Sequence, residues 1–244
     1  MSLPKPYYEE SGIVIYNADA REILPHLPPV DLVLTDPPYE LTASGGGIGA
    51  KRKYLADIDG HIDEGFDDSI LSQFRNWYCF CSKEQMPKLI WRAMEDGRRW
   101  MLITWNKPNP TPLVNANYLP DSEYIVHGFA AADCLYGGYE TRSRFILHPA
   151  EQNHFAHPTV KPIAVVSRLM RTGSAVGHLI LDPFMGSGTT LVAAKQLGRR
   201  AIGVEIEEKY CAIAAERLRQ QVLDFGPAPE PDGVQESLFG GDGA

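Results

Sequence analysis

Short, largely apolar runs alternate along the chain with stretches in which apolar residues recur at helical spacing. Runs that are apolar on both faces are typical of parallel strands covered by helices on both sides. They lie at residues 12–19, 30–35, 99–105, 179–182 and 201–205. The pattern therefore predicts an α/β fold with a doubly wound, mostly parallel sheet.

Three stretches have helical spacing, and the first two end at a glycine. Residues 86–96 stop at Gly97, residues 190–197 stop at Gly198, and residues 207–222 close the fold. In the helix at residues 86–96, the side chains expected to face the core are Leu89, Ile90, Ala93 and Met94. In the helix at residues 207–222, Arg217 is expected on the polar face. A chain of 244 residues is most simply one domain, so we expect residues 1–222 to fold together.

The run at residues 179–182 leads directly into a glycine-rich turn. Its sequence is Asp182-Pro183-Phe184-Met185-Gly186-Ser187-Gly188-Thr189-Thr190. Gly186 and Gly188 let the backbone turn tightly and approach a ligand closely. The next strand ends in Glu205. Strand, glycine turn, helix, strand and acid are typical of a nucleoside-binding βαβ unit, in which Glu205 would accept hydrogen bonds from ribose hydroxyls.

The same turn indicates a nucleoside without phosphates. It has no lysine before Lys195, so it is not a Walker loop, and Leu191 replaces the third glycine of the dinucleotide motif. S-adenosylmethionine is then the cofactor that fits best. The alternative is a tight turn between strand and helix that binds no ligand.

A second loop follows the run at residues 30–35 and reads Asp36-Pro37-Pro38-Tyr39. The two prolines stiffen the backbone just past a strand end, where open α/β sheets bind their ligands. The Asp36 carboxylate can accept hydrogen bonds from an exocyclic amino group while Tyr39 stacks on the base that carries it. The alternative is a rigid turn with a capping aspartate.

With both loops in view, the chain resembles the amino-group (N6-adenine or N4-cytosine) DNA methyltransferases. The order of the two motifs, with Asp36-Pro37-Pro38-Tyr39 before the cofactor motif, resembles the permuted beta class of that family. The resemblance covers most of residues 12–222 and implies a Rossmann-like methyltransferase fold. It also implies a site-specific enzyme of restriction-modification type with double-stranded DNA as its partner.

The resemblance assigns residues to roles. It implies that Asp36, Pro37, Pro38 and Tyr39 are catalytic. It also implies a cofactor-binding set: Asp19, Asp36, His157, Thr159, Lys161, Asp182, Pro183, Phe184, Gly186, Ser187, Gly188, Thr189, Thr190 and Glu205. Within this set, the acid at 19 would approach the cofactor adenine and the segment around Lys161 would help to enclose its methionine end.

The implied chemistry is a direct in-line transfer to a flipped-out base. Hydrogen bonds from the amino group to the Asp36 side chain and the Pro37 carbonyl would draw the nitrogen toward tetrahedral geometry. By resemblance, Asp at position 36 favours adenine N6, because cytosine-N4 enzymes more often carry Ser there. An RNA or protein-glutamine methyltransferase, or a catalytically silent DNA- or clamp-binding module, remains an alternative.

The net charge of −8 is unusual for a protein that binds nucleic acid. Five acids and no Lys or Arg lie in the last 21 residues, so the rest of the chain carries only −3. Phosphate contacts are then expected from local clusters. The candidates are Lys51, Arg52 and Lys53 in a glycine-rich loop, which could equally be a solvated loop, and Arg142 and Arg144.

The two arginines lie within residues 106–156, where prolines, aromatics and arginines mix. We expect this segment to be a small target-recognition insertion, with a purely structural insertion as the alternative. Residues 223–244 read as a disordered acidic tail. Within it Gln235, Leu238 and Phe239 resemble a sliding-clamp-binding peptide; the alternative is an inert tail.

Four cysteines, Cys79, Cys81, Cys134 and Cys211, show no zinc spacing, and no metal is expected. The chain has no apolar stretch long enough for a membrane span and no signal-peptide pattern. We therefore expect a cytoplasmic protein, which could form a homodimer.

Overall fold

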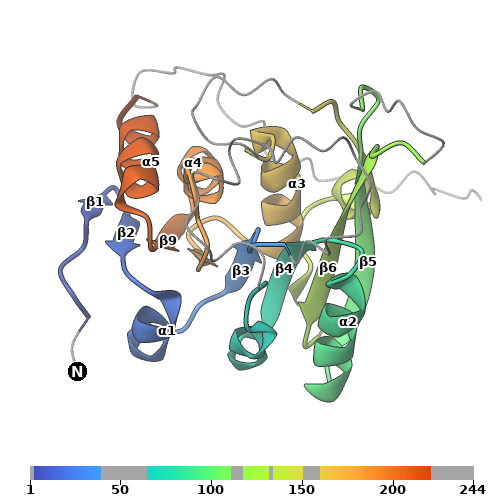
Figure 1. Ribbon diagram of the computed structural model, residues 1–244, viewed down its shortest axis with the longest axis horizontal. Helices are drawn as coiled ribbons and strands as arrows, with labels where there is room; N and C mark the ends of the chain where they lie inside the picture. The colour runs from blue at the N-terminus through green and yellow to red at the C-terminus, as the bar shows by residue number, and fades with distance from the viewer. Residues whose placement is uncertain (1–2, 40–64, 111–117, 132–133, 151–159, 221–244) are drawn as a thin grey trace, which may run out of the picture.

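The computed structural model describes residues 3–39, 65–110, 118–131, 134–150 and 160–220, in which nine strands form one sheet (Figure 1). The spatial order is β1-β2-β9-β8-β3-β4-β6-β5-β7. The strands are β1 (Tyr8–Glu10), β2 (Ile13–Asn17), β3 (Leu32–Thr35), β4 (Asn76–Cys81), β5 (Arg99–Asn106), β6 (Ser122–Phe129), β7 (Phe145–Leu147), β8 (Leu179–Asp182) and β9 (Arg200–Glu205). From β2 to β4 every neighbouring pair is parallel. Antiparallel pairs occur where β1 meets β2 and where β6 meets β4 and β5.

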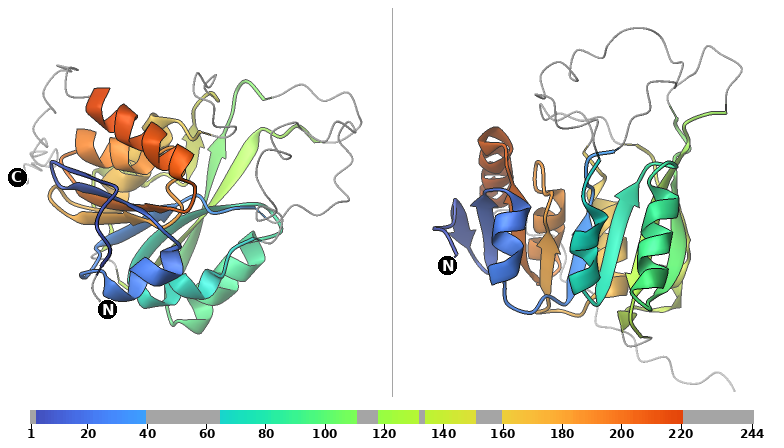
Figure 2. Two further views of the ribbon diagram at one scale, coloured as in Figure 1. Left: turned by 60° about the vertical axis from the view of Figure 1, so that its left-hand side comes forward. Right: turned by 60° about the horizontal axis from the view of Figure 1, so that its bottom comes forward.

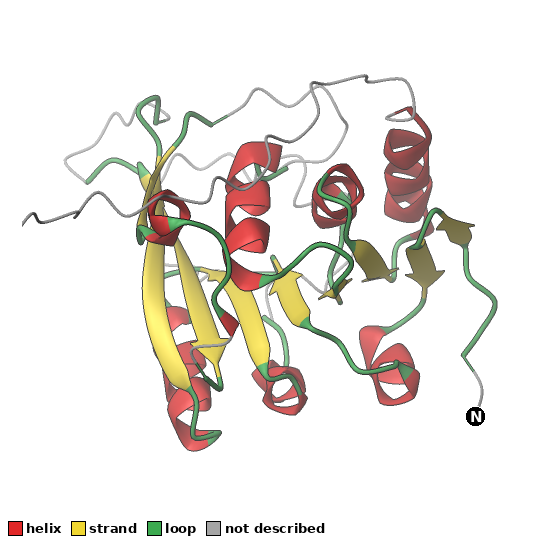
Figure 3. Cartoon of the chain, turned by 180° about the vertical axis from the view of Figure 1, so that it is seen from behind, coloured by secondary structure: helices red, strands yellow, loops and turns green. Residues whose placement is uncertain are grey.

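Helices cover both faces of the sheet (Figures 2 and 3). They are α1 (Ala20–Ile23), α2 (Met86–Glu95), α3 (Ile163–Gly173), α4 (Thr189–Gln196) and α5 (Glu208–Gln220). Helices α3, α4 and α5 lie on one face, and α1 and α2 lie on the other. The predicted doubly wound α/β fold is confirmed, because a mostly parallel sheet lies between two helical layers.

Two buried apolar clusters hold these layers together. One lies between the sheet and α3, α4 and α5 and includes Leu34, Ile180 and Leu191. The other faces α1 and α2 and includes Val33 and Leu181. Successive residues of β3 and β8 thus enter opposite clusters, as the alternation of side chains along a strand requires. This is why both strands read as unbroken apolar runs.

Residues 106–156, predicted to be a target-recognition insertion, include two strands of the sheet within their described parts. Strand β6 lies inside the range and pairs with both β4 and β5, with Ile125 and Val126 fully buried. Strand β7 also lies inside the range and pairs with β5. The described parts of the segment therefore contribute to the core, and its role in target recognition stays a prediction.

Strands β4 and β6 were not predicted from the sequence, and in β6 the polar residue His127 interrupts the apolar run. His127 of β6 is buried between the rings of Tyr78 and Phe129, whose centroids lie 3.9 and 4.5 Å away. Its Nε2 lies 2.9 Å from Oδ1 of Asn76 on β4, and burial lowers the pKa of His127 to about 3. A neutral histidine paired with a buried amide satisfies both polar groups inside the sheet.

Helix α2 buries fewer of its apolar residues than the sequence predicted. Leu89 and Ala93 are buried as predicted, but Met94 is 55% exposed, so its predicted inward position is wrong. Among the described residues, no helix combines the length and the apolar character that crossing a membrane would need.

Gly128 of β6 provides a test of this packing. A Cβ built there would lie 2.2 Å from the ring of Trp77, which is fully buried on β4. We predict that Gly128→Ala lowers the free energy of unfolding by about 1–3 kcal/mol, because neither strand can move away. Urea denaturation measures the change. In a Trp77→Phe background the same substitution should cost less, and equal costs in both backgrounds would contradict the contact.

Candidate active site

The two loops singled out in the sequence meet at one edge of the sheet. Strands β3 and β8 are parallel neighbours, so Asp36 and Asp182 both stand at carboxyl ends. The Thr35 hydroxyl donates a 2.7 Å hydrogen bond to Oδ1 of Asp182, which ties the two strand ends together. Residues 147 positions apart in the chain are thus brought to one place. This edge is where doubly wound sheets bind ligands.

The glycine turn is held in place by an acid from the neighbouring strand. Gly186 and Gly188 have φ of 50° and 79°, a region that favours glycine. The Gly186 amide donates to Oε2 of Glu205 at 3.0 Å, and the Glu207 amide donates to Oε1 at 2.9 Å. The predicted ribose acid therefore stands directly beside the predicted cofactor turn.

Asp182 anchors the start of this turn. The Phe184 amide donates to its Oδ1 at 3.2 Å. Burial raises the pKa of Asp182 to about 7, although hydrogen bonds from Thr190 and Thr35 oppose the shift. Asp182 is 3% exposed, so its visible role is to fix the turn. The Phe184 ring packs edge-on against Phe66, with 5.6 Å between centroids.

Arg217 of α5 binds the glycine turn at Ser187 and Thr189. Its Nη1 donates to the Ser187 carbonyl at 2.6 Å and lies 3.2 Å from the hydroxyl oxygens of Ser187 and Thr189. The sequence placed Arg217 on the polar face of the last helix, but it is only 7% exposed. Helical periodicity misses it, because a buried arginine is recognisable only from the carbonyl and hydroxyls that it binds.

The Asp36 loop is rigid and partly buried. The Gln85 side chain donates to the Pro38 carbonyl at 2.8 Å. The side chain of Asp36 is 27% exposed, yet its Oδ1 and the Tyr39 hydroxyl are buried and find no hydrogen-bond partner within the described part of the chain. Burial raises the pKa of Asp36, and burial with the nearby charge of Asp36 holds the pKa of Tyr39 well above its usual value. The loop thus presents an acceptor that is available for a donor.

Lys161 lies against this loop and not against the glycine turn. Its Nζ lies 2.5 Å from Oδ2 of Asp36 and 3.4 Å from Oε2 of Glu123, whose Oε1 lies 2.6 Å from Lys107. Burial acts to lower the pKa of Lys161, but the charges of Asp36 and Glu123 outweigh it and raise that pKa. Two partly buried acids, one of them the predicted catalytic Asp36, and two lysines therefore balance one another's charge.

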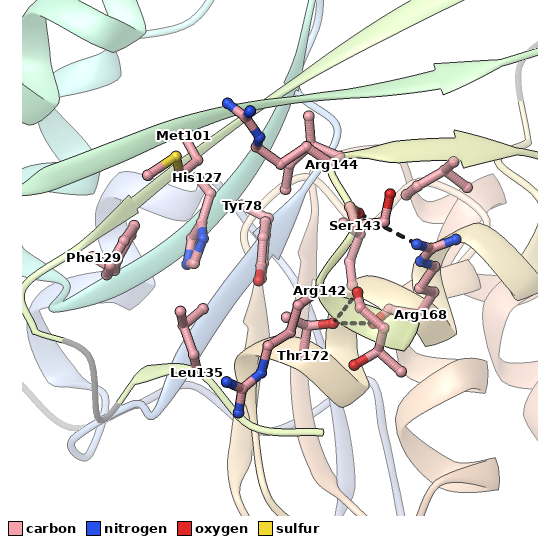
Figure 4. Close-up of a pocket in the computed structure, with 14 residues that line it drawn as sticks. Tyr78, Met101, His127, Phe129, Leu135, Arg142, Ser143, Arg144, Arg168 and Thr172 are labelled. Carbon is pink, nitrogen blue, oxygen red and sulfur yellow. Dashed lines mark hydrogen bonds between the residues drawn. The ribbon is translucent and has the colours of Figure 1, made fainter. Parts of the chain in front are cut away.

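Asp19 lies near Glu205, whereas Arg142 and Arg144 lie beside a different cavity. Asp19 caps α1 by accepting a 2.9 Å hydrogen bond from the Arg21 amide, close to β2, which pairs with β9. Arg142 and Arg144 are exposed and line a cavity of about 430 Å³ beside α3, whose lining does not include Asp36 (Figure 4). The remaining predicted residues lie outside the described residues: Lys51, Arg52, Lys53, His157, Thr159, Gln235, Leu238 and Phe239.

The cysteines offer no obvious nucleophile. All four are buried, and burial raises the pKa of Cys81, next to the site, to about 12. A thiol of that pKa stays protonated at neutral pH. Within the ranges that the structure covers, no group of three or more His, Cys, Asp or Glu could hold a metal ion.

Comparison with known proteins places this geometry in a family. The sequence model described as DNA methylase matches residues 137–216. The Type II methyltransferase M2.LlaDCHI of Lactococcus lactis subsp. cremoris is 30% identical over 89% of this chain and 93% of its own. The Type II methyltransferase M2.DpnII of Streptococcus pneumoniae is 28% identical over 90% of this chain and 94% of its own.

Solved structures agree with the sequence relatives. The crystal structure of the M1.HpyAVI–SAM complex has a TM-score of 0.64 and 26% identity, covering 84% of this chain and all of that one. The PvuII DNA methyltransferase (cytosine-N4-specific) has a TM-score of 0.66, with 87% of this chain and 88% of that chain covered; at 17% identity it shows the fold alone. The chain belongs to the N6/N4 DNA methylase family, whose members transfer a methyl group from S-adenosylmethionine to an amino group in DNA.

Proposed function

We propose that this DNA methyltransferase acts on the N6 amino group of adenine, with Asp36 and the Pro37 carbonyl as the hydrogen-bond acceptors. The observation that carries the proposal is the buried, unpartnered Oδ1 of Asp36, because it offers a free acceptor in a loop tied to the glycine turn through Thr35. The choice of adenine rests on the aspartate itself, since cytosine-N4 enzymes of this family more often carry serine at that position.

The acceptors would act on a poor nucleophile. The lone pair of an aromatic amino group is delocalised into the ring, and two hydrogen bonds from its N–H groups favour the tetrahedral nitrogen. Negative charge on Asp36 also stabilises the positive charge that develops there. Because Gln85 and two prolines hold the loop, little reorganisation is required when the base arrives.

Glu205, beside the glycine turn, offers hydrogen-bond acceptors that fit the ribose of an adenosyl group. Each carboxylate oxygen of Glu205 accepts one backbone N–H, which leaves lone pairs for the hydroxyls of a ribose. The turn lacks a phosphate-binding lysine, in keeping with a cofactor that has none. When bound, S-adenosylmethionine supplies an electrophilic methyl group on sulfonium. We propose that Phe184 helps to cover the adenosyl group and that Asp19 approaches its adenine.

A base inside a duplex cannot reach this loop, so the target would be flipped out and stacked on Tyr39. Arg142 and Arg144, with the basic residues Lys51, Arg52 and Lys53, are the proposed phosphate contacts. The motif order supports assignment to the permuted beta class. The peptide at Gln235 remains a proposed docking point for a sliding clamp, and homodimerisation remains a proposal.

The modified base is the first prediction to test. The purified protein should incorporate tritiated methyl groups into unmethylated duplex DNA. Nucleoside analysis by mass spectrometry should then find N6-methyladenine, and modification-sensitive sequencing should map one sequence context. N4-methylcytosine as the product would overturn the adenine proposal and leave the methyltransferase assignment intact.

Asp36→Ala should reduce methyl transfer by at least about 100-fold, because it removes the acceptor that stabilises the developing charge. Cofactor affinity, measured by calorimetric titration, should change little, since Glu205 and the glycine turn are untouched. A matched control is Asp121→Ala, at an exposed position of a connecting segment. Equal losses of transfer and of cofactor binding in Asp36→Ala would contradict the role given to Asp36.

Tyr39→Ala should weaken binding of the target base more than binding of the cofactor. Stacking of a base on an aromatic ring contributes about 1–3 kcal/mol, which corresponds to roughly tenfold or more in affinity. A duplex with 2-aminopurine at the mapped target position reports the flipped base by fluorescence. An unchanged fluorescence titration would exclude Tyr39 as the stacking platform.

A further inference from the structure

The charge cluster beside the proposed catalytic loop contains one lysine placed between two acids. Lys161 Nζ lies 2.5 Å from Oδ2 of Asp36 and 3.4 Å from Oε2 of Glu123. The rings of Tyr39 and Phe80 flank the ammonium, with centroids 5.3 and 5.2 Å away. Lys161 is 8% exposed, so its charge is held within this small enclosure.

Each carboxylate oxygen of Glu123 faces a lysine, one closely and one at a longer distance. Its Oε1 lies 2.6 Å from Lys107 Nζ, and that lysine in turn lies 4.8 Å from the centroid of the Trp105 ring. Its Oε2 is buried and forms only the longer ion pair with Lys161, at 3.4 Å and without hydrogen-bond geometry. Because a charge-assisted hydrogen bond is shorter, about 2.8 Å, this oxygen can bind the same ammonium more tightly than it does here.

We propose that Lys161 is a displaceable stand-in for the target amino group and that Glu123 is the positioning residue that receives it. In the absence of DNA, the ammonium pairs with Asp36. When the amino group of the base reaches Asp36, the ammonium shifts to Oε2 of Glu123. This inference rests on the proposed role of Asp36 as the acceptor of that amino group.

The shift is small and leaves every charge paired. A charge-assisted N–H···O bond is about 2.8 Å long, so a movement of roughly half an ångström brings Lys161 to Glu123. Lys107 already compensates Glu123, which keeps Glu123 from drawing the ammonium away from Asp36 before the base arrives. No new charge is buried, because each lysine keeps a carboxylate partner throughout.

The shift also removes an obstacle to the chemistry. A cation bound to Asp36 occupies one acceptor oxygen and repels the positive charge that develops on the amino nitrogen. Repulsion between like charges is strong in a partly buried site, where the effective dielectric constant is low. Movement of Lys161 toward Glu123 lengthens its contact with Oδ2 of Asp36, so the carboxylate of Asp36 stabilises that charge more strongly.

The test is Glu123→Gln, which keeps the shape of the side chain and removes its charge. We expect kcat for methyl transfer to fall about 10- to 100-fold, with cofactor affinity unchanged within twofold. The exposed Glu95 on α2 provides the matched control, and Glu95→Gln should behave as the unaltered protein. Wild-type kcat in Glu123→Gln would overturn the inference.

The pH profile separates this role from a merely structural one. Asp36 must be ionised to accept the amino group, and the charge of Glu123 raises the pKa of Asp36. The acid limb of kcat/KM should therefore move to lower pH in Glu123→Gln even though the plateau falls. The titratable groups whose pKa senses the charge of Asp36 are Lys161, Tyr39, Cys79, Cys81 and Asp182. A lower plateau with an unmoved acid limb would reduce Glu123 to a structural residue and overturn the inference.

Glu123→Asp provides a second measurement if the glutamine variant folds poorly. It keeps the charge but withdraws the carboxylate from Lys161, so kcat should fall while the acid limb stays in place. Wild-type kcat in Glu123→Asp contradicts the inference. Asp36→Ala, assayed alongside, keeps the two proposals apart: an active Asp36→Ala overturns the proposed function, whereas an inactive one with fully active Glu123 variants overturns only the displacement of Lys161.

Discussion

The hydrogen bond from Thr35 to Asp182 joins the two loops on which the site is built. It exists because β3 and β8 are parallel neighbours, and parallel strands deliver their carboxyl ends to one edge. One loop then brings an aspartate in a stiff proline frame, and the other brings a glycine turn held by Glu205. A sheet in which these strands lay apart would separate the acceptor from the proposed cofactor site, and no side-chain movement could restore the contact.

Near the ends of β3 and β8, hydrogen bonds and ion pairs offset the free-energy cost of burying Asp36 and Asp182. Burial raises the pKa of both Asp36 and Asp182, so each acid needs partners to serve its purpose. Asp182 receives hydrogen bonds from neutral groups and fixes a turn. Asp36 instead faces Lys161, which is shared with Glu123. The difference supports the different tasks that we propose for the two acids: Asp182 fixes the turn, and Asp36 accepts hydrogen bonds from the target amino group.

Much of the fold and the family could be predicted from the sequence, because the relevant signals are local. The apolar runs that became β3 and β8, the two prolines after Asp36 and the glycines of the turn are contiguous in the chain. The resemblance to the methyltransferase family then indicated that the two loops belong to one site. Only the structure shows that β3 and β8 are neighbours in the sheet, whereas the chemistry of each loop could be predicted from the sequence.

What the sequence pattern missed depends on tertiary partners. His127 and Gly128 break the apolar pattern of β6, yet one is paired with a buried amide and the other makes room for the Trp77 ring. Arg217 appeared to be a surface residue until the turn that it binds was in place. Glu123 carried no motif at all, and only the distances to two lysines give it a role.

The most direct measurement is a crystal structure of the protein with S-adenosylhomocysteine and an unmethylated duplex that contains the target sequence. The account predicts that the ribose hydroxyls bind Glu205 and that the sulfur faces the carboxylate of Asp36, with the target amino group between them and the base stacked on Tyr39. A complex in which the sulfur points away from Asp36, or in which the base enters elsewhere, would contradict it.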